Sequence, residues 1–267
     1  MADSERPEAP AHRPMSPLVA ALWTIALTLL IQVSVGVTDA ARPGAQWDIV
    51  NLAACELLAT SLVVFAMVRV HAREISLRTT LGLRSIAPLH FVLAAAAGAG
   101  LYPLLSTVDD LMLRRWPLQD PQATESLQKV VTSASPAALV IAAFVVMPLA
   151  RELFFRGIVY GEVKIAAGAR TALLATAVFY ACSSLEWQEM PTAVVLGLAL
   201  AWLRERTGTV LAAIVGQLAF YAVPGVPILR GRDPAADLTF PTRWILGGAL
   251  IAVLALVGVG AGRRGDE

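Results

Sequence analysis

Long apolar runs separated by short polar connections extend along almost the whole chain. Each run approaches the roughly 20 residues that a transmembrane helix needs. The expected spans are residues 18–37, 49–70, 88–108, a fourth that starts at 136, then 171–185, 191–203, 210–223 and 244–260. The fifth, sixth and seventh runs are short, so we expect those helices to extend a few residues into their flanks. The pattern predicts an all-α fold, a polytopic transmembrane helical bundle of about eight spans.

The polar stretches divide the chain into four parts. The first is polar and rich in proline, which predicts a disordered tail. The second ends in a long polar connection, in which residues 124–132 predict a short amphipathic helix at the membrane interface. The expected parts are the tail at 1–17, N-terminal transmembrane helices with the polar connection at 18–135, a motif core at 136–223, and a loop with the last transmembrane helix at 224–267.

Composition supports a membrane protein and excludes an ordinary soluble domain. The 267 residues are 57% hydrophobic and only 15% charged, whereas about a quarter of the residues in soluble domains are charged. The formal net charge of +1 gives no reason to expect a nucleic-acid partner. Tryptophans fall near the ends of the expected spans, as interfacial anchors do; they are Trp47, Trp116, Trp187 and Trp244. The lipid bilayer is therefore the first expected partner.

Orientation follows from the basic residues in the connections. With eight spans, both termini lie on one side of the membrane. Lys and Arg are more numerous in the connections on that side. Because cytoplasmic loops carry an excess of these residues, we expect cytoplasmic termini.

The fourth span brings three charged residues into an apolar setting. They are Arg151, Glu152 and Arg156, and the last two are spaced to share one helix face and pair. A pair that reaches out to the interface is one interpretation, and a functional site is the other. One positive charge is left over, so we expect Glu56 in the second span to approach Arg151 or Arg156.

Histidine and cysteine positions argue against metal and thiol chemistry. His12, His71 and His90 all lie in the first half of the chain, which leaves no histidine for a metal site in the second half. Cys55 and Cys182 lie in apolar runs and are interpreted as small packing residues without a disulfide. No histidine is available to activate Cys182 as a nucleophile. We expect no cofactor and no metal.

Three segments of the second half carry a family resemblance. They are Arg151-Glu152-Leu153-Phe154-Phe155-Arg156-Gly157, Phe179-Tyr180-Ala181-Cys182-Ser183, and the run from Trp202-Leu203-Arg204-Glu205-Arg206-Thr207-Gly208 to Gly216-Gln217-Leu218-Ala219-Phe220-Tyr221. Their order and spacing resemble the CPBP family, that is, the CAAX prenyl proteases and the bacteriocin-processing proteins also called Abi. The resemblance covers about residues 136–223. It implies a glutamate-dependent intramembrane protease of the bacterial inner membrane.

The resemblance also implies a set of catalytic positions, most of which are substituted. In the family, a carboxylate and an imidazole activate water while a second imidazole and an amide stabilise the oxyanion. The matching positions here are Arg151 for the first glutamate, Glu152 for the second, Arg156 for the motif arginine, Ser183 and Gln217 for the two histidines, and Tyr221 for the small polar residue. A guanidinium cannot act as a base near neutral pH, and a serine hydroxyl is far less basic than an imidazole.

These substitutions leave two main hypotheses. The first is a proteolytically impaired binding or regulatory subunit whose partner is a transmembrane or lipid-modified peptide or protein. The second is an active glutamate-dependent endopeptidase in which Glu152 is the sole base and Gln217 and Tyr221 form the oxyanion hole. A transporter or channel fits less well, because no paired interrupted helices appear in two matching halves.

Structural roles remain open for the same residues. Ser183 could bond back to its own helix, and Gln217 and Tyr221 could join neighbouring helices. If the family pocket persists, we expect Arg151, Glu152, Ser183, Gln217 and Tyr221 to converge in one cavity between the fourth, fifth and seventh spans.

Overall fold

The described part of the chain is helical, as the sequence predicts. The structure is a computed structural model that describes residues 14–71, 76–117, 129–130, 134–184, 187–233 and 239–261. Its main helices are α1 (Pro17–Ala41), α2 (Ile49–His71), the short α3 (Leu77–Thr80), α4 (Pro88–Arg115), α6 (Pro136–Ile141), α7 (Met147–Glu152), α8 (Tyr160–Ala167), α9 (Ala169–Ser183), α10 (Met190–Thr207), α11 (Val210–Leu229) and α12 (Thr242–Ala261). A 3₁₀ turn, η1 (Ala45–Trp47), joins α1 to α2.

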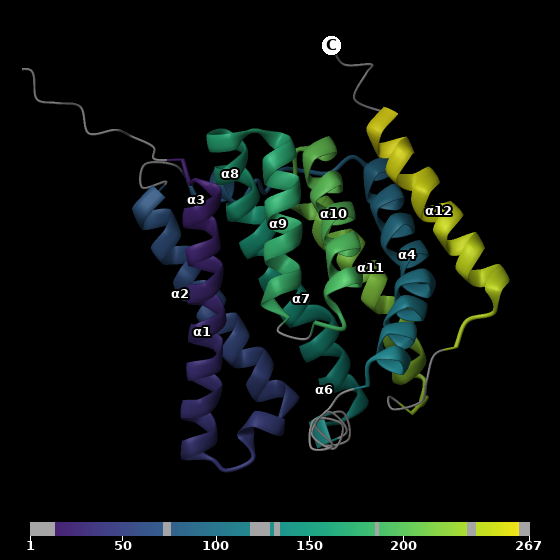
Figure 1. Cartoon of the computed structure of the whole chain (residues 1–267), viewed down its shortest axis with the longest axis horizontal. Coiled ribbons are helices and arrows are strands. Elements are labelled where there is room, and N and C mark those ends of the chain that lie inside the picture. The colour runs from purple at the N-terminus through teal and green to yellow at the C-terminus, as the bar shows by residue number, and fades with distance from the viewer. Residues whose placement is uncertain are drawn as a thin grey trace, which may run out of the picture.

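The helices cross one bundle repeatedly between two ends (Figure 1). Within the described residues, six stretches are long and apolar enough to cross a membrane by length and composition: α1, α2, α4, α6 through α8, α11 and α12. The shorter α9 and the more polar α10 run between the same two ends, which agrees with about eight crossings. The start of α1 and the end of α12 lie on the same side of the bundle (Figure 1).

The outer helices expose far more apolar side chains than the surface of a soluble protein does. Leu18 of α1 is 71% exposed, and Leu246 of α12 is 65% exposed. Long rows of further Leu, Val and Ile side chains on α1, α2 and α12 are similarly exposed. Contiguous apolar surface of this extent marks contact with a membrane. The chain is an integral membrane protein whose outer surface contacts lipid.

The helix that carries the charged motif is continuous but irregular. It runs from Pro136 to Ala167 and contains two π-helical segments, η2 (Ala142–Val146) and η3 (Leu153–Val159). Pro148 lies two residues after the end of η2. Its ring displaces the carbonyl one turn earlier and it lacks a backbone donor, which favours a wider turn there. The second π segment holds most of the motif, and such segments occur frequently at functional sites.

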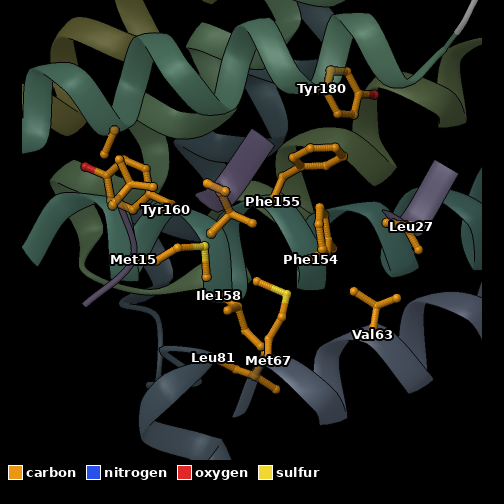
Figure 2. Packing of buried hydrophobic residues seen from close by; sticks show 14 of the residues in the cluster. Met15, Leu27, Val63, Met67, Leu81, Phe154, Phe155, Ile158, Tyr160 and Tyr180 are labelled. Carbon is orange, nitrogen blue, oxygen red and sulfur yellow. The ribbon is translucent and has the colours of Figure 1, made fainter. Parts of the chain in front are cut away.

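The motif helix is also the centre of the main apolar core (Figure 2). Phe154, Phe155 and Ile158 are almost completely buried. They pack with Met67 of α2 and with residues of α1 and α9. In a soluble protein, burying an aromatic or aliphatic side chain stabilises the core by about 1.5–3 kcal/mol. Between membrane helices, close packing contributes more of the stabilisation than removal from water does. The charges of the motif are thus fixed in position by large neighbours on the same helix.

Glycines let α4 approach two other helices closely, as its composition predicts. A Cβ atom on Gly98 would lie only 1.8 Å from the carbonyl oxygen of Gly216 on α11. A Cβ atom on Gly100 or on Gly248 of α12 would lie 2.6 Å from the carbonyl oxygen of the other glycine. Small residues at such contacts allow the backbones to touch, which is a main source of helix association in membranes.

Three boundaries differ from the expected ones. Met15 is fully buried and Ser16 caps α1 by accepting a bond from the Val19 amide, so these two residues belong to the bundle and not to a tail. Helix α4 continues to Arg115, beyond the expected end of the third span. Polar side chains mark where a helix leaves the apolar core of the membrane and not where the helix ends, so the polar residues after 108 do not indicate the end of α4.

The third difference lies after the motif core. The loop expected from residue 224 begins later, because α11 continues through Pro224 and Pro227 to Leu229. Prolines are tolerated in membrane helices where neighbouring groups satisfy the freed carbonyls. The expected interfacial helix at 124–132 falls largely outside the described residues.

A matched glycine pair tests the packing of α4 against α12. In Gly248→Ala the new methyl group meets the Gly100 carbonyl, so the helices must separate, at a cost of about 1–3 kcal/mol. The adjacent Gly247 has nothing within 4 Å of a Cβ atom, and Gly247→Ala should be neutral or slightly stabilising. Thermal unfolding in detergent, followed by size-exclusion chromatography, should show a lower melting temperature for Gly248→Ala alone. Equal melting temperatures for the two variants would contradict the contact.

Candidate functional site

An ion pair joins the motif helix to α2. Arg151 Nε lies 2.6 Å from Glu56 Oε1, and Arg151 Nη2 lies 3.3 Å from Glu56 Oε2. The Glu56 side chain is 3% exposed, whereas that of Arg151 is 31% exposed. Two parallel bonds of this kind are the strong geometry for an arginine and a carboxylate. The expectation that Glu56 neutralises a motif arginine is confirmed.

A second ion pair lies deeper in the bundle. Arg156 Nη1 is 2.7 Å from Glu152 Oε1, one helical turn away, and both side chains are completely buried. Arg156 Nη2 also donates to the carbonyl oxygen of Gly197 on α10 at 2.9 Å. A Cβ atom on Gly197 would lie 3.3 Å from that nitrogen, so a glycine at this position gives the guanidinium room. The motif arginine therefore ties η3 to α10.

Tyr180 connects this pair to α11. Its ring lies 4.6 Å below the Arg156 guanidinium, a cation–π contact. Its hydroxyl accepts a hydrogen bond of 3.0 Å from Gln217 Nε2, and it also interacts with the Tyr221 side chain. Tyr221 in turn stacks on Phe144, with ring centroids 5.5 Å apart. A continuous polar chain thus runs from Glu152 across α9 to α11.

The turn between α10 and α11 holds the motif helix from the other side. Gly208 ends α10 in the left-handed conformation, with φ of 71°. Just before it, Arg204 Nε donates to the Arg156 carbonyl oxygen at 3.1 Å. Just after it, Thr209 Oγ1 donates to the Arg84 carbonyl oxygen at 2.8 Å. The residues that flank the Glu-Arg-Thr-Gly segment therefore hold the motif helix and the connection before α4 to the same turn.

A cavity of about 440 Å³ opens beside this polar chain. Its wall includes Arg151, Tyr180 and Tyr221. Part of the lining comes from the ends of α4 and α11 and the start of α10, and we call this part of the cavity its mouth. These helix ends lie toward the side of the bundle opposite to the start of α1 (Figure 1). Five charged residues of the lining belong to the mouth; they are Asp109, Asp110, Glu189, Arg232 and Asp233. Thr192 Oγ1 donates to Asp109 Oδ1 at 2.6 Å and orients that carboxylate.

The family-matched residues are only partly brought together. Arg151 and Tyr221 line the cavity, whereas Glu152 and Gln217 are buried and are not among its lining residues. Ser183 does not line it: its hydroxyl donates to the Tyr180 carbonyl oxygen at 2.7 Å, within its own helix. The expectation of one cavity shared by all five residues therefore holds for two of them. The back-bonded role that sequence left open for Ser183 is the observed one.

Three buried polar atoms of this site have no hydrogen-bond partner among the described residues. They are Glu152 Oε2, Arg156 Nε and Gln217 Oε1. Because almost all buried polar atoms are paired in folded proteins, such atoms mark strain, an ordered water or a functional group. All three atoms belong to positions matched to the family's motifs.

Some residues of the site escaped sequence reasoning. The sequence marks Tyr180 only as part of a motif, and nothing in its spacing reveals that it links Arg156 to Gln217. Asp109 and Asp110 lie in the expected polar connection, but two carboxylates inside an apolar helix are themselves a signal of a functional site. Within the described ranges no three His, Cys, Asp or Glu side chains gather in a way that could hold a metal ion.

Comparison with known proteins agrees with the motifs. Residues 133–223 match the family described as type II CAAX prenyl endopeptidase Rce1-like. No curated protein and no solved structure matches the chain. The match spans the motif core that the sequence indicates, and it confirms the resemblance to the CPBP and CAAX prenyl protease family.

Neutralising Glu56 tests the ion pair between α2 and α7. Glu56→Gln leaves Arg151 without its counter-ion, and removing one partner of a buried pair costs on the order of 3–5 kcal/mol. Because Arg151 is partly exposed to the cavity, we expect the lower end of that range. The melting temperature in detergent should fall clearly.

Asp48→Asn is the control for this experiment. It removes one charge from the exposed pair between Arg42 and Asp48, and asparagine still serves as a helix cap. The loss should be below about 1 kcal/mol. Equal effects of Glu56→Gln and Asp48→Asn would mean that the buried pair does not stabilise the bundle.

Proposed function

We propose that this chain is a proteolytically impaired member of the CAAX protease type that binds a partner polypeptide in the membrane. The partner is a transmembrane or lipid-modified peptide or protein, and the chain acts as a binding or regulatory subunit. The observation that carries the proposal is that Arg151 and Arg156 are each paired with a carboxylate. In addition, the second half of the chain contains no histidine that could act as a base.

The chemistry of the substituted positions supports the loss of hydrolysis. Water activation needs a base within hydrogen-bonding reach of the water, and general bases contribute about 10²–10⁴ in rate. Arg151 stands where the first glutamate would be and is held by Glu56. Glu152 is the one carboxylate on a matching position, and Arg156 occupies one of its oxygens. Ser183 bonds to its own helix and offers no imidazole.

The cavity supports the binding role. Its volume of about 440 Å³ lies within the range of ordinary ligand sites, which is about 300–1,000 Å³. Arg151 presents a partly exposed guanidinium to it, and Tyr221 adds an aromatic surface. The mouth carries more carboxylates than cations. This arrangement suits a polypeptide whose polar end enters the cavity while its apolar part remains in the bilayer.

One observation favours a second function, an active glutamate-dependent endopeptidase that processes lipidated or C-terminal-tail peptides. The unpartnered oxygens of Glu152 and Gln217 are buried next to the cavity wall residue Tyr180. A water between such oxygens would be near a carboxylate that could deprotonate it. In this alternative, Glu152 is the base, and Gln217 and Tyr221 stabilise the oxyanion.

We further propose that the protein resides in a bacterial inner membrane with both termini in the cytoplasm. The excess of Lys and Arg in the connections on the side of the termini supports this orientation, although Arg243 in the first turn of α12 adds to the opposite side. The cavity mouth then faces away from the cytoplasm. Reporter fusions after Thr80 and after Gly231 should report the cytoplasm and the opposite side, respectively. Two fusions reporting the same side would rule out this topology.

Hydrolysis is tested directly with purified protein in lipid. We expect no cleavage of a panel of transmembrane, prenylated and C-terminal-tail peptides above the level of Glu152→Gln, because Arg156 holds the one carboxylate on a matching position. Cleavage would be followed by mass spectrometry of the products. Turnover that disappears in Glu152→Gln would establish the endopeptidase and exclude the impaired subunit.

The converse experiment restores the family residues. The variant Arg151→Glu, Ser183→His, Gln217→His and Tyr221→Asn reinstates both imidazoles, the amide and the first glutamate of the family motif. Glu56→Gln is added so that the carboxylate introduced at position 151 does not face a like charge. We expect weak hydrolysis to return if the cavity geometry is intact. A folded, silent variant would show that the geometry as well as the chemistry has changed.

A further inference from the structure

A second hollow lies on the outer, lipid-facing surface of the bundle. It has a volume of about 690 Å³, and α9, α10 and α12 form its sides. The side chains that line it are almost all aliphatic and include Leu173, Leu174, Val195, Leu198, Val253 and Val257. We call this feature the lateral groove. Trp202 forms one end of its wall and donates a 3.2 Å hydrogen bond to the Leu256 carbonyl oxygen, which pins α12 to α10 at the base of the groove.

The lateral groove is separate from the polar cavity. Both features use α10, but on different faces: Thr192 and Leu196 line the cavity, whereas Val195 and Leu198 line the groove. The groove contains none of the six positions matched to the family's catalytic motifs. Its occupant therefore need not be the partner that enters the cavity.

Two cations stand at one end of the groove. Arg170, in the first turn of α9, is part of its wall. Arg206, in the last turn of α10, lies 4.1 Å above the ring of Trp202. Within the described part of the chain, no carboxylate pairs with either arginine, and the buried Arg206 Nε has no hydrogen-bond partner there. By contrast, Lys164 at the same end of the bundle is paired with Glu205.

We propose that the lateral groove holds one acyl chain of an anionic phospholipid, with the lipid phosphate bound by Arg170 and Arg206. The apolar walls match a hydrocarbon chain, and their open side faces the bilayer. The two guanidinium groups lie at the bundle end, where the phosphates of lipids are found, and arginine is well suited to binding a phosphate through parallel hydrogen bonds. Basic pockets between membrane helices bind lipid head groups in this way.

A second copy of the chain fits the groove less well. A symmetric dimer brings the same surface of both copies together. Contact through this face would place two sets of Arg170 and Arg206 against each other, and like charges repel. An anionic lipid supplies negative charge at this place instead.

Native mass spectrometry from nanodiscs tests the proposal and reads the oligomeric state at the same time. The protein is placed in nanodiscs of phosphatidylcholine that contain a minor fraction of phosphatidylglycerol. We expect the released protein to be a monomer that retains about one phosphatidylglycerol in preference to phosphatidylcholine. Each arginine near an anionic lipid contributes about a fivefold preference, so Arg170→Gln with Arg206→Gln should reduce the retention of phosphatidylglycerol by about tenfold or more.

Two further variants separate the groove from general charge effects. Arg243→Gln removes an exposed cation at the other end of the bundle and should leave lipid retention unchanged. Val195→Trp narrows the groove from its exposed side and should reduce retention while both arginines remain. The proposal is overturned if Arg243→Gln acts as strongly as the double variant, if wild-type protein retains no preferred lipid, or if the released species is a dimer that Val195→Trp dissociates.

Discussion

Charge compensation inside the membrane is the constraint on which this structure depends. An isolated charge at that depth is expensive, yet the motif helix brings in two arginines and one glutamate. Glu56 from α2 supplies the fourth charge, so Arg151 and Glu56 form one pair and Arg156 and Glu152 the other. The pairing holds α2 against the motif helix, because separating the two helices would leave an uncompensated charge on each of them.

Around these pairs, the aromatic residues and the glycine of the motif are packed tightly into the core of the bundle. Phe154 and Phe155 fill the core, and Gly157 passes so close to Leu81 that a Cβ atom would lie 2.9 Å from its side chain. Arg156 is used for architecture, since it holds η3 against α10 through the Gly197 carbonyl. The arrangement left open to the outside is a cavity lined by the Arg151 guanidinium and three tyrosines, with carboxylates at its mouth.

The sequence predicts those parts of the structure that depend on whether a side chain favours water or the membrane interior. Apolar runs indicate the spans, and the cost of a buried charge indicates that Glu56 meets a motif arginine. Contacts that depend on which face of a helix meets its neighbour cannot be predicted from these preferences. The two π-helical segments change the direction of the side chains that follow them on the motif helix. On α9, residue spacing alone does not tell which side chain faces the cavity, so the absence of Ser183 from it and the central place of Tyr180 become visible only in three dimensions. The predicted start of a loop at residue 224 is also wrong, because contacts with neighbouring helices allow α11 to continue past Pro224.

The central claim is that Glu152 is held by Arg156 as a structural partner. A double-mutant cycle measures this most directly: the stability of the wild-type protein is compared with that of Glu152→Gln, Arg156→Gln and the double variant in the same lipid. The account predicts a coupling free energy of about 1–3 kcal/mol, as found for residues in direct ionic contact. A coupling close to zero would contradict it, because Glu152 would then be free of Arg156 and available for other chemistry.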